Sequence, residues 1–508
     1  MVLAAFVAIW ASPAFALDGQ VRIHDPSTIM LCDGKWYTYG TGGTPLVSDD
    51  GWTWRTGTRA SRSGAAPDVI RVGDRYYQYI SHGAMIWSKS LDPNSPDYGW
   101  QDGGNVFGSE GPDDFINPID PGAFLDPTDG KLWVTYGSYV GYTRVVELDP
   151  KTGKRVDSKF TNVAVNCEAT TMIYHDGWYY LLATHGSCCR GADSGYNIRV
   201  GRSKKVTGPF IDNMGIDMME GGGKLVCGSG GRLIGAGHFG LIDLGNGVQK
   251  FSLHWEADLD RGGASVLDVL PVLWKDGWPI AGDNFKEGAY EIESVRTGTA
   301  LELAVEGVPV GGPRSRGGRG AGLGGAAPNE RGGGEGRGGA PGAASGGQGG
   351  GESGRRGGGF GGGMFGGTSR GPIPPQDVAQ VSTNWPIGNI DIRMSNYMCQ
   401  AQQKWTVTPV ANGGGYLGSP YFKITIAGTD RTLAVGEDGE LVALPAFTGG
   451  DEQLWRIDQL TDGTWRVTPK FASAAKELLA LSAIGSSFAT LAKFDPASDK
   501  QRWLFKTP

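Results

Sequence analysis

The chain has 508 residues and a net charge of −7 at pH 7, a length that suits two or three domains with sizeable cores. Its 16 Trp, 17 Tyr and 18 Phe exclude a chain that is disordered throughout, because such chains lack aromatic side chains to bury. An acidic body repels phosphate backbones and anionic lipid surfaces, so the charge argues against nucleic acid as a partner and suits a neutral substrate.

The first 16 residues form an apolar run that ends in Ala14-Phe15-Ala16, a small-x-small cleavage pattern. This predicts a signal peptide over residues 1–16, although the usual positive charges at its start are missing. No other stretch reaches the roughly 20 apolar residues of a membrane span. We therefore expect a secreted protein, extracellular or periplasmic, without a membrane span.

The six cysteines are few for this length and lack the spacing of metal ligands. We expect buried thiols with at most one bridge. The neighbours Cys188 and Cys189 are not expected to pair with each other, because disulfide geometry suits more distant partners.

Residues 17–284 show no sustained helical periodicity, only short aromatic and β-branched runs, which predicts an all-β domain. Five such runs recur at intervals of 40 to 70 residues, and a turn precedes each. The runs are Lys35–Tyr39, Arg75–Ile80, Lys131–Tyr136, Trp178–Ala183 and Gln249–His254. Since each interval has room for three or four strands, the pattern predicts a five-bladed β-propeller.

An ionisable residue stands six to nine positions before each of these turns. The five are Asp25, Asp68, Asp120, Glu168 and His238. In a propeller the first strand of each blade lines the central channel, so residues at one register should converge at one mouth of it.

Two interpretations of these residues compete. Asp-Pro and Pro-Asp pairs are ordinary turn chemistry, so Asp25, Asp68 or Asp120 alone would be expected to cap a turn. Glu168 differs because it follows the apolar stretch 163–167, where burial would raise its pKa as a general acid requires. Paired carboxylates at the mouth of an all-β domain indicate glycoside hydrolysis.

Several stretches in this domain resemble the arabinanases of glycoside hydrolase family 43, over Val21 to Ile280. Together the order and spacing of these motifs are specific. They are His24-Asp25-Pro26-Ser27, Asn117-Pro-Ile-Asp120-Pro121, Tyr136-Gly-Ser138, Glu168-Ala169, Cys188 to Asn197, Val200-Gly-Arg-Ser203, Gly208-Pro-Phe210, Gly237-His238 and Asp276-Gly-Trp-Pro279.

The resemblance implies a role for each matching residue. Asp25 would be the general base that activates water, Glu168 the general acid, and Asp120 a carboxylate that orients Glu168 and raises its pKa. Inversion at the anomeric carbon is expected. His238 matches a histidine that holds an ion, usually calcium, through a largely water-filled shell. His24, Asn117 and Ser138 would bind substrate.

Three departures from the family pattern affect the expected cleft. Gly64 stands where relatives usually have Trp, Gly195 replaces a Thr, and the run Phe251–Trp255 only loosely follows the usual His-Tyr-Tyr-Asp. The resemblance therefore leaves endo against exo action open.

Residues 285–508 carry three Gln-x-Trp triplets, 50 and 48 residues apart. Each closes a unit opened by an apolar strand, which resembles a ricin-type β-trefoil. Sugar-binding relatives usually have Asp where this chain has Ala304, Ala434 and Ala480, so we expect a packing module and leave sugar binding open. A Gly/Arg-rich insertion over 308–375, with 29 of the chain's 87 glycines in 311–370, is expected to interrupt the first repeat as a disordered surface loop.

The expectation for the whole chain is a secreted, monomeric, inverting glycosidase that cleaves α-1,5-linked arabinan in plant cell-wall polysaccharide. Alternatives are an exo-acting arabinofuranosidase, xylosidase or galactanase of the same family, or a propeller that binds glycans without cleaving them. The joint presence of Asp25, Asp120 and Glu168 argues against the last of these.

Overall fold

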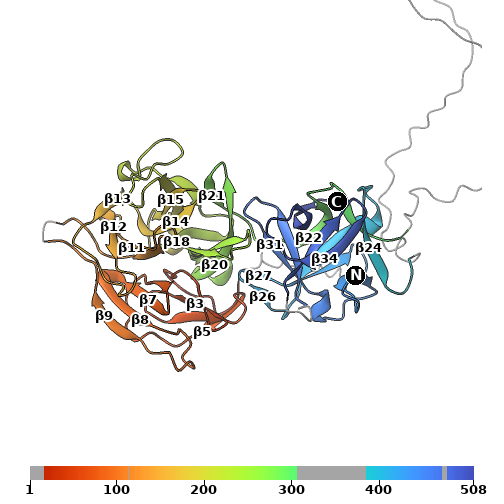
Figure 1. Cartoon of the computed structure of the whole chain (residues 1–508), viewed down its shortest axis with the longest axis horizontal. Helices are drawn as coiled ribbons and strands as arrows, with labels where there is room; N and C mark the ends of the chain where they lie inside the picture. The colour runs from red at the N-terminus through yellow and green to blue at the C-terminus, as the bar shows by residue number, and fades with distance from the viewer. Residues whose placement is uncertain (1–16, 112–113, 306–384, 472–476) are drawn as a thin grey trace, which may run out of the picture. The chain divides into compact units, whose positions relative to one another are not determined.

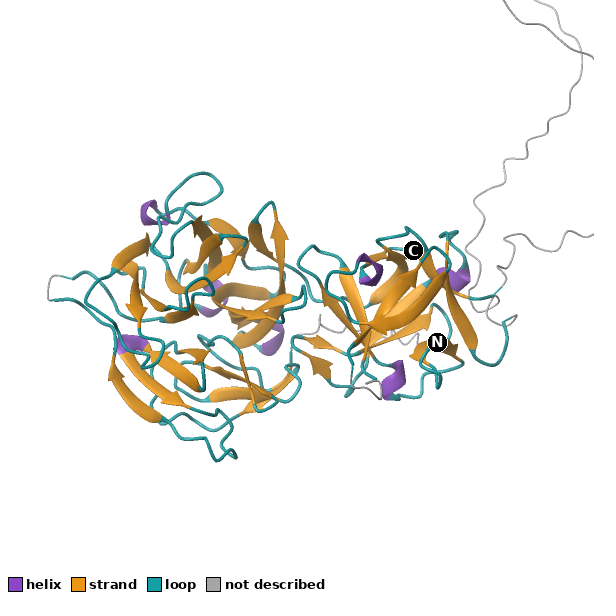
Figure 2. Ribbon diagram, in the orientation of Figure 1, coloured by secondary structure: helices purple, strands orange, loops and turns teal. Residues whose placement is uncertain are grey.

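The computed structural model describes residues 17–111, 114–305, 385–471 and 477–508. The predicted signal peptide and the insertion 308–375 lie outside the described residues. Within these ranges the chain forms strands joined by turns and seven short 3-10 helices, without an α-helix (Figure 2), which confirms the all-β prediction. None of the described helices is long and apolar enough to cross a membrane.

Five sheets of four successive strands each make up the first domain, and their order follows the sequence (Figure 1). Within each blade these four strands are antiparallel, as expected of strands joined by short turns. Blades 1 to 3 contain β2 (Met30–Cys32), β3 (Lys35–Tyr39), β4 (Pro45–Ser48) and β5 (Thr53–Thr56); β6 (Asp68–Val72), β7 (Arg75–Ile80), β8 (Ala84–Ser88) and β9 (Gln101–Asn105); β10 (Gly122–Leu125), β11 (Leu132–Gly137), β12 (Tyr142–Leu148) and β13 (Thr161–Val165).

The first two strands of blade 4 and the first three of blade 5 are longer than any strand of blades 1 to 3. They contain β14 (Glu168–His175), β15 (Trp178–His185), β16 (Asn197–Ser203) and β17 (Lys224–Cys227); β18 (Leu233–Asp243), β19 (Gln249–Asp258), β20 (Ala264–Lys275) and β21 (Trp278–Ala281). Short 3-10 helices lie in the connections: η1 (Ser81–Gly83), η2 (Gly191–Asp193), η3 (Met218–Glu220) and η4 (Leu259–Arg261). The five-bladed propeller is therefore confirmed.

Each predicted turn joins the first and second strands of its blade, and each aromatic run forms the second strand. Asp33 and Asp176 precede glycines in two of these turns and adopt φ of 50° and 48°, the left-handed conformation that Asp tolerates in tight turns. Trp36 and Tyr37 of β3 are both buried, so the run fills space between sheets.

The N-terminal segment ties the first blade to the fifth. Val21 and Ile23 exchange backbone hydrogen bonds with β20, through Leu267 N to Val21 O (2.8 Å) and Ile23 N to Ser265 O (3.3 Å). A further strand, β1 (Asp18–Gly19), pairs in parallel with β5 of blade 1. Main-chain contacts between the N-terminal segment and both blades thus close the ring of blades.

The C-terminal region contains a 12-stranded sheet system and the hairpin β26–β27. A short 3-10 helix precedes strands β25, β31 and β35. The elements are β22 (Gly288–Ser294), β23 (Ala300–Leu303), β24 (Ile390–Ser395), η5 (Ala401–Gln403), β25 (Trp405–Pro409), β26 (Gly415–Tyr416), β27 (Ser419–Pro420), β28 (Phe422–Ile426), β29 (Thr432–Val435), β30 (Leu441–Leu444), η6 (Asp451–Gln453), β31 (Trp455–Gln459), β32 (Trp465–Pro469), β33 (Leu479–Ile484), β34 (Phe488–Lys493), η7 (Asp499–Gln501) and β35 (Trp503–Lys506).

Threefold repetition is visible in the contacts of the three Gln-x-Trp tryptophans. Trp405, Trp455 and Trp503 are fully buried. Their indole N–H groups donate to the carbonyls of Leu301, Leu433 and Leu481, at 2.8, 3.0 and 2.9 Å. The three repeat units are therefore built alike. The assignment of the region as a ricin-type β-trefoil stays a prediction.

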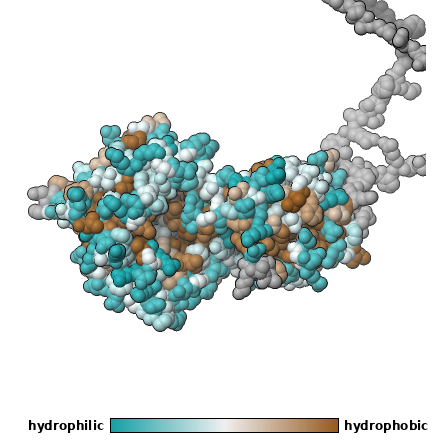
Figure 3. Space-filling model, in the orientation of Figure 1, coloured by the Kyte–Doolittle hydropathy of each residue, from teal (hydrophilic) through white to brown (hydrophobic). Residues whose placement is uncertain are grey.

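Hydrophilic side chains cover most of the face that Figure 3 shows, with apolar residues scattered among them. Among the large apolar residues that are exposed, Phe115, Tyr139 and Val140 lie in two loops of blade 3. The bridge between Ile116 and Gly141 holds these two loops together.

Candidate active site

The structure places three of the five ionisable residues of the predicted register close together: Asp25, Asp120 and His238. His238 Nδ1 lies 3.2 Å from Asp25 Oδ1, and His238 Nε2 lies 4.0 Å from Asp120 Oδ2. Asp25, Asp120 and His238 all adopt positive φ, at 53°, 53° and 59°. Such strained backbone at non-glycine residues clusters at functional sites, and here it recurs at one register of three blades.

Asp68 occupies the same register but makes different contacts. Its carboxylate accepts the backbone N–H of Thr28 at 2.9 Å and of Ala123 at 2.8 Å, which links blade 2 to the chain before β2 and to β10. Asp68 is buried, and both of its oxygens are occupied by main-chain donors. It therefore holds neighbouring blades together.

The carboxylate of Asp25 is surrounded by hydrogen-bond donors and histidines. Oδ2 accepts the Thr41 hydroxyl at 2.5 Å and lies 2.8 Å from His24 Nδ1. The backbone N–H of Asp25 donates to His254 Nδ1 at 2.8 Å, so His254 is unprotonated at that nitrogen. This arrangement fixes both the position and the ionisation of the carboxylate.

Burial would raise the pKa of Asp25, but the neighbouring histidines, among them His24 with its hydrogen bond, hold that pKa below its ordinary value. Desolvation lowers the pKa of His238 to about 4. Burial also opposes protonation of His24, yet its bonds to Asp25 and Glu256 raise its pKa to about 10. At neutral pH Asp25 is therefore ionised, as a general base must be. The His24 ring beside it is cationic.

The surroundings of Glu168 favour its protonated form, whereas those of Asp25 favour its ionised form. It begins β14, is buried, and accepts a short hydrogen bond from the Tyr196 hydroxyl. Desolvation raises the pKa of Glu168 to about 7; the Tyr196 bond lowers it, and the charges of Asp25 and Glu256 raise it. Near neutral pH a substantial fraction of Glu168 is therefore protonated and able to donate its proton.

Asp120 is buried, and its pKa is raised well above the ordinary value by desolvation and by the charges of Glu168 and Asp25. Among the causes found for the raised pKa of Glu168, desolvation is the largest and Asp120 is not one of the leading charges. The expected influence of Asp120 on Glu168 stays a prediction.

Asn117 and Ser138 lie in the loops before β10 and after β11, in the same blade as Asp120. Ser138 is buried, and its hydroxyl accepts the backbone N–H of Val140 at 3.1 Å. Within the described part of the chain, no hydrogen bond joins either side chain to Asp25, Asp120 or Glu168. Their predicted contact with substrate stays a prediction.

Sequence reasoning missed two residues of the site, His254 and Glu256. Both lie on β19, two positions apart, and therefore point to the same face of the strand. Glu256 Oε1 lies 3.1 Å from His24 Nε2 and 3.6 Å from His254 Nε2. The spacing of these two polar residues at i and i+2 was the signal in the sequence that could have placed them on one face of the strand.

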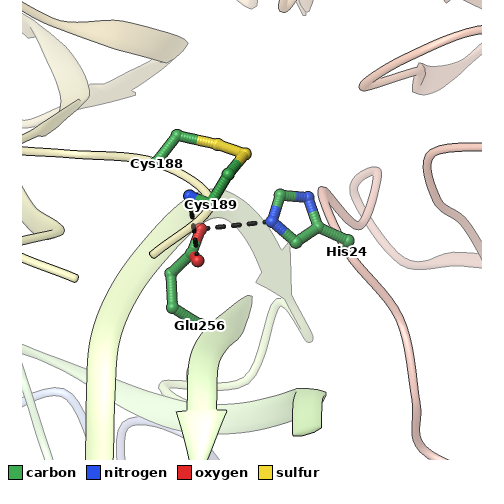
Figure 4. A group of neighbouring side chains, drawn as sticks. All are labelled: His24, Cys188, Cys189 and Glu256. Atoms are coloured by element: carbon green, nitrogen blue, oxygen red, sulfur yellow. Dashed lines mark hydrogen bonds and ion pairs between the residues drawn. A yellow bond between two sulfur atoms is a disulfide. The ribbon is translucent and has the colours of Figure 1, made fainter. Parts of the chain in front are cut away.

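The expectation about the adjacent cysteines was wrong. Cys188 and Cys189 form a disulfide, while Cys32, Cys167, Cys227 and Cys399 are free. Cys189 adopts φ of 63°, a left-handed conformation that turns the chain sharply at the pair. Figure 4 shows this disulfide beside Glu256 and His24.

Comparison with known proteins agrees with this geometry. The sequence profile of Glycosyl hydrolases family 43 matches residues 36–279. An extracellular exo-α-(1→5)-L-arabinofuranosidase of Cellvibrio japonicus is 32% identical over 304 residues, covering 51% of this chain and 86% of the relative. An extracellular endo-α-(1→5)-L-arabinanase of Bacillus subtilis is 29% identical over 301 residues, covering 53% and 90%.

A solved structure of a Cellvibrio cellulosa α-L-arabinanase complexed with arabinohexaose is 30% identical, with a TM-score of 0.48, and covers 52% of this chain and 96% of that one. The identity to the first relative and its coverage establish the family. The chain, whose matched residues form a five-bladed propeller, belongs to glycosyl hydrolase family 43.

Proposed function

We propose that this glycoside hydrolase cleaves α-1,5-linked L-arabinofuranosyl bonds in arabinan with inversion at the anomeric carbon. One observation carries the proposal: Asp25 contacts His24 and His238, which favour its ionised form, whereas Glu168 is buried, which raises its pKa to about 7. The names of the two relatives, an exo-acting and an endo-acting enzyme on α-(1→5)-L-arabinosyl linkages, support the substrate.

In the proposed reaction each carboxyl group handles one proton. Glu168 donates its proton to the glycosidic oxygen as the bond from that oxygen to the anomeric carbon breaks. Asp25 takes a proton from the water that attacks the same carbon from the opposite face. The exposed rings of Phe115 and Tyr139, in the blade that carries Asp120, offer apolar faces on which sugar rings could pack.

Calcium at His238 is part of the same proposal. Both ring nitrogens of His238 are buried and neither forms a hydrogen bond among the described residues, although Nδ1 lies 3.2 Å from Asp25 Oδ1, which fits a nitrogen that serves as a ligand. A single protein ligand implies a shell completed by water. A bound cation would add positive charge beside Asp25 and Asp120.

We further propose that the protein is secreted and acts as a monomer. The apolar stretch over residues 1–16, with its Ala14-Phe15-Ala16 pattern, supports export. The extracellular location in the names of both relatives supports it too.

Digestion of linear α-1,5-arabinan tests the substrate and the stereochemistry together. We expect arabinose or arabino-oligosaccharides whose first-formed anomeric signal in proton NMR is β, inverted from the α linkage. Product length then decides between endo and exo action, and linear xylan and galactan serve as comparison substrates. Release of α-configured first products, or faster cleavage of xylan or galactan, would contradict the proposal.

The Tyr196 hydroxyl provides a test of the pH dependence. Activity should fall as pH rises through about 7, because Glu168 then loses the proton that it must donate. Tyr196→Phe removes a hydrogen bond that stabilises the ionised form of Glu168, so its pKa rises. A bond to a charged group contributes about 1.5 to 3 kcal/mol, so the alkaline limb of the pH profile should move upward by roughly one unit or more.

The matched control for this prediction is Tyr180→Phe. Tyr180 is also buried, and its hydroxyl donates to the carbonyl of Gly277 at 2.7 Å, away from Glu168. Its variant should keep the wild-type alkaline limb. An unmoved limb in Tyr196→Phe would show that the hydroxyl does not control the acid.

A further inference from the structure

We propose that Glu256 is a positioning residue that acts through His24 to hold the general base Asp25 in place. The contacts form a chain: Glu256 Oε1 lies 3.1 Å from His24 Nε2, and His24 Nδ1 lies 2.8 Å from Asp25 Oδ2. This inference rests on the proposed function of Asp25, and it assigns a role to a residue of β19 that the reaction itself does not use.

Glu256 is well fixed for such a role. Its side chain is 2% exposed, and Oε2 accepts the backbone N–H of Cys189 at 3.0 Å. Because Cys189 is bonded to Cys188, the turn that supplies this N–H is closed by a covalent link (Figure 4). One carboxylate oxygen therefore accepts from the turn and the other from His24.

His24, by contrast, depends on its partners for its orientation. Its side chain is 29% exposed, and its two ring nitrogens each face a carboxylate oxygen. Both nitrogens must then donate, since a carboxylate only accepts. Among the described residues Glu256 is the one hydrogen-bond partner of His24 Nε2, so its loss would leave the ring held only through Nδ1 and less firmly oriented toward Asp25.

A metal site is the alternative interpretation of the same atoms. Ligand atoms of His24, Cys188, Cys189 and Glu256 lie within 4.8 Å of one another. The two sulfurs, however, are joined in the disulfide and cannot act as thiolate ligands. Hydrogen bonding to His24 and to the Cys189 N–H accounts for the carboxylate of Glu256 without a metal.

A double-mutant cycle tests whether Glu256 acts through His24. Glu256→Gln keeps the shape but can no longer accept from both donors. We expect it to lower kcat/KM on linear arabinan by about 100-fold, the usual cost of a misplaced catalytic group, mainly through kcat. In the His24→Ala background the same substitution should lower kcat/KM very little further. An equal loss in both backgrounds would overturn the proposal and indicate a structural role.

A spectroscopic measurement decides the same question independently of activity. The chain has six histidines, so selective ¹⁵N-histidine labelling gives few imidazole signals, and His24→Ala assigns those of His24. We expect a slowly exchanging Nε2–H of His24 in the wild type that is absent in Glu256→Gln. If it persists in that variant, the positioning role is wrong. A wild type that shows this signal but does not hydrolyse arabinan would sink the proposed function alone.

Two further variants guard against unfolding as the explanation. Glu256→Asp keeps the buried charge but shortens the side chain, and it should reproduce the loss and its dependence on His24. Glu302→Gln is the matched control: Glu302 is also buried and accepts two bonds, from Arg393 at 2.7 Å and Gln403 at 2.8 Å. It should leave kcat/KM and the His24 signal unchanged.

Discussion

Glu168→Gln should lower kcat/KM on linear arabinan by roughly 10³-fold, within the range that general acid catalysis contributes. The amide keeps the size of the side chain and can still accept from Tyr196, but it has no proton to give to the departing oxygen. The loss should shrink strongly on an arabinofuranoside with a dinitrophenyl leaving group, because that group departs without protonation. Kinetics on the two substrates measure the difference.

Glu147→Gln is the control for this substitution. Glu147 lies on β12 and pairs with Lys131 at 3.1 Å on the outside of blade 3, so its variant should behave as wild type on both substrates. An equal loss on both substrates in Glu168→Gln would mean that Glu168 places the sugar and does not act as the acid.

The arrangement of the blades could be predicted because the turn residues and the aromatic strands that mark each blade are recognisable in the local sequence. Asp33 and Asp176 mark turns whose left-handed backbone few residues tolerate, and the following aromatic runs have no polar face to expose. The register of Asp25 relative to the turn follows from this repetition. Its convergence with His238 and Asp120 is a consequence of the ring, and the contacts confirm it.

The position of a carboxylate relative to its turn could not show whether it has a structural role or the catalytic role that we propose. Asp68 and Asp120 stand next to prolines at similar distances from their turns. They differ in their partners: Asp68 accepts two backbone N–H groups, whereas Asp120 lies 4.0 Å from His238. Such partners come from other blades, so neighbours in sequence do not reveal them.

Glu256 was hidden for a related reason. Polar and apolar residues alternate along β19 from Lys250 to Asp258, but every residue of the strand except the first is buried, so the alternation does not single out Glu256 among its polar residues. Its contact with Cys189 arises across 67 positions of sequence, and the turn there depends on a disulfide between neighbours. The strongest signals of the sequence therefore pointed to Glu168 and Asp25, the proposed acid and base, but not to the residues that contact them.

Asp25→Asn should have the largest effect, a loss of about 10³- to 10⁴-fold in kcat/KM, because the amide cannot take a proton from the attacking water. A good leaving group should not restore activity, since the missing step is the activation of the nucleophile. Added azide needs no deprotonation and should partly restore cleavage of the dinitrophenyl substrate. The product, identified by NMR, should be the β-L-arabinofuranosyl azide, inverted from the substrate.

Asp68→Asn separates this effect from the loss of a buried carboxylate as such. Both residues are buried aspartates at the same register, but Asp68 accepts the N–H groups of Thr28 and Ala123, and Asn can accept from only one of them. The unmatched N–H should lower the free energy of unfolding by about 1 to 3 kcal/mol, measured by denaturant titration, while kcat per folded molecule stays near wild type. If Asp68→Asn instead lost activity as Asp25→Asn does, the assignment of the base to Asp25 alone would be wrong, because any buried carboxylate of the ring would then be equally required.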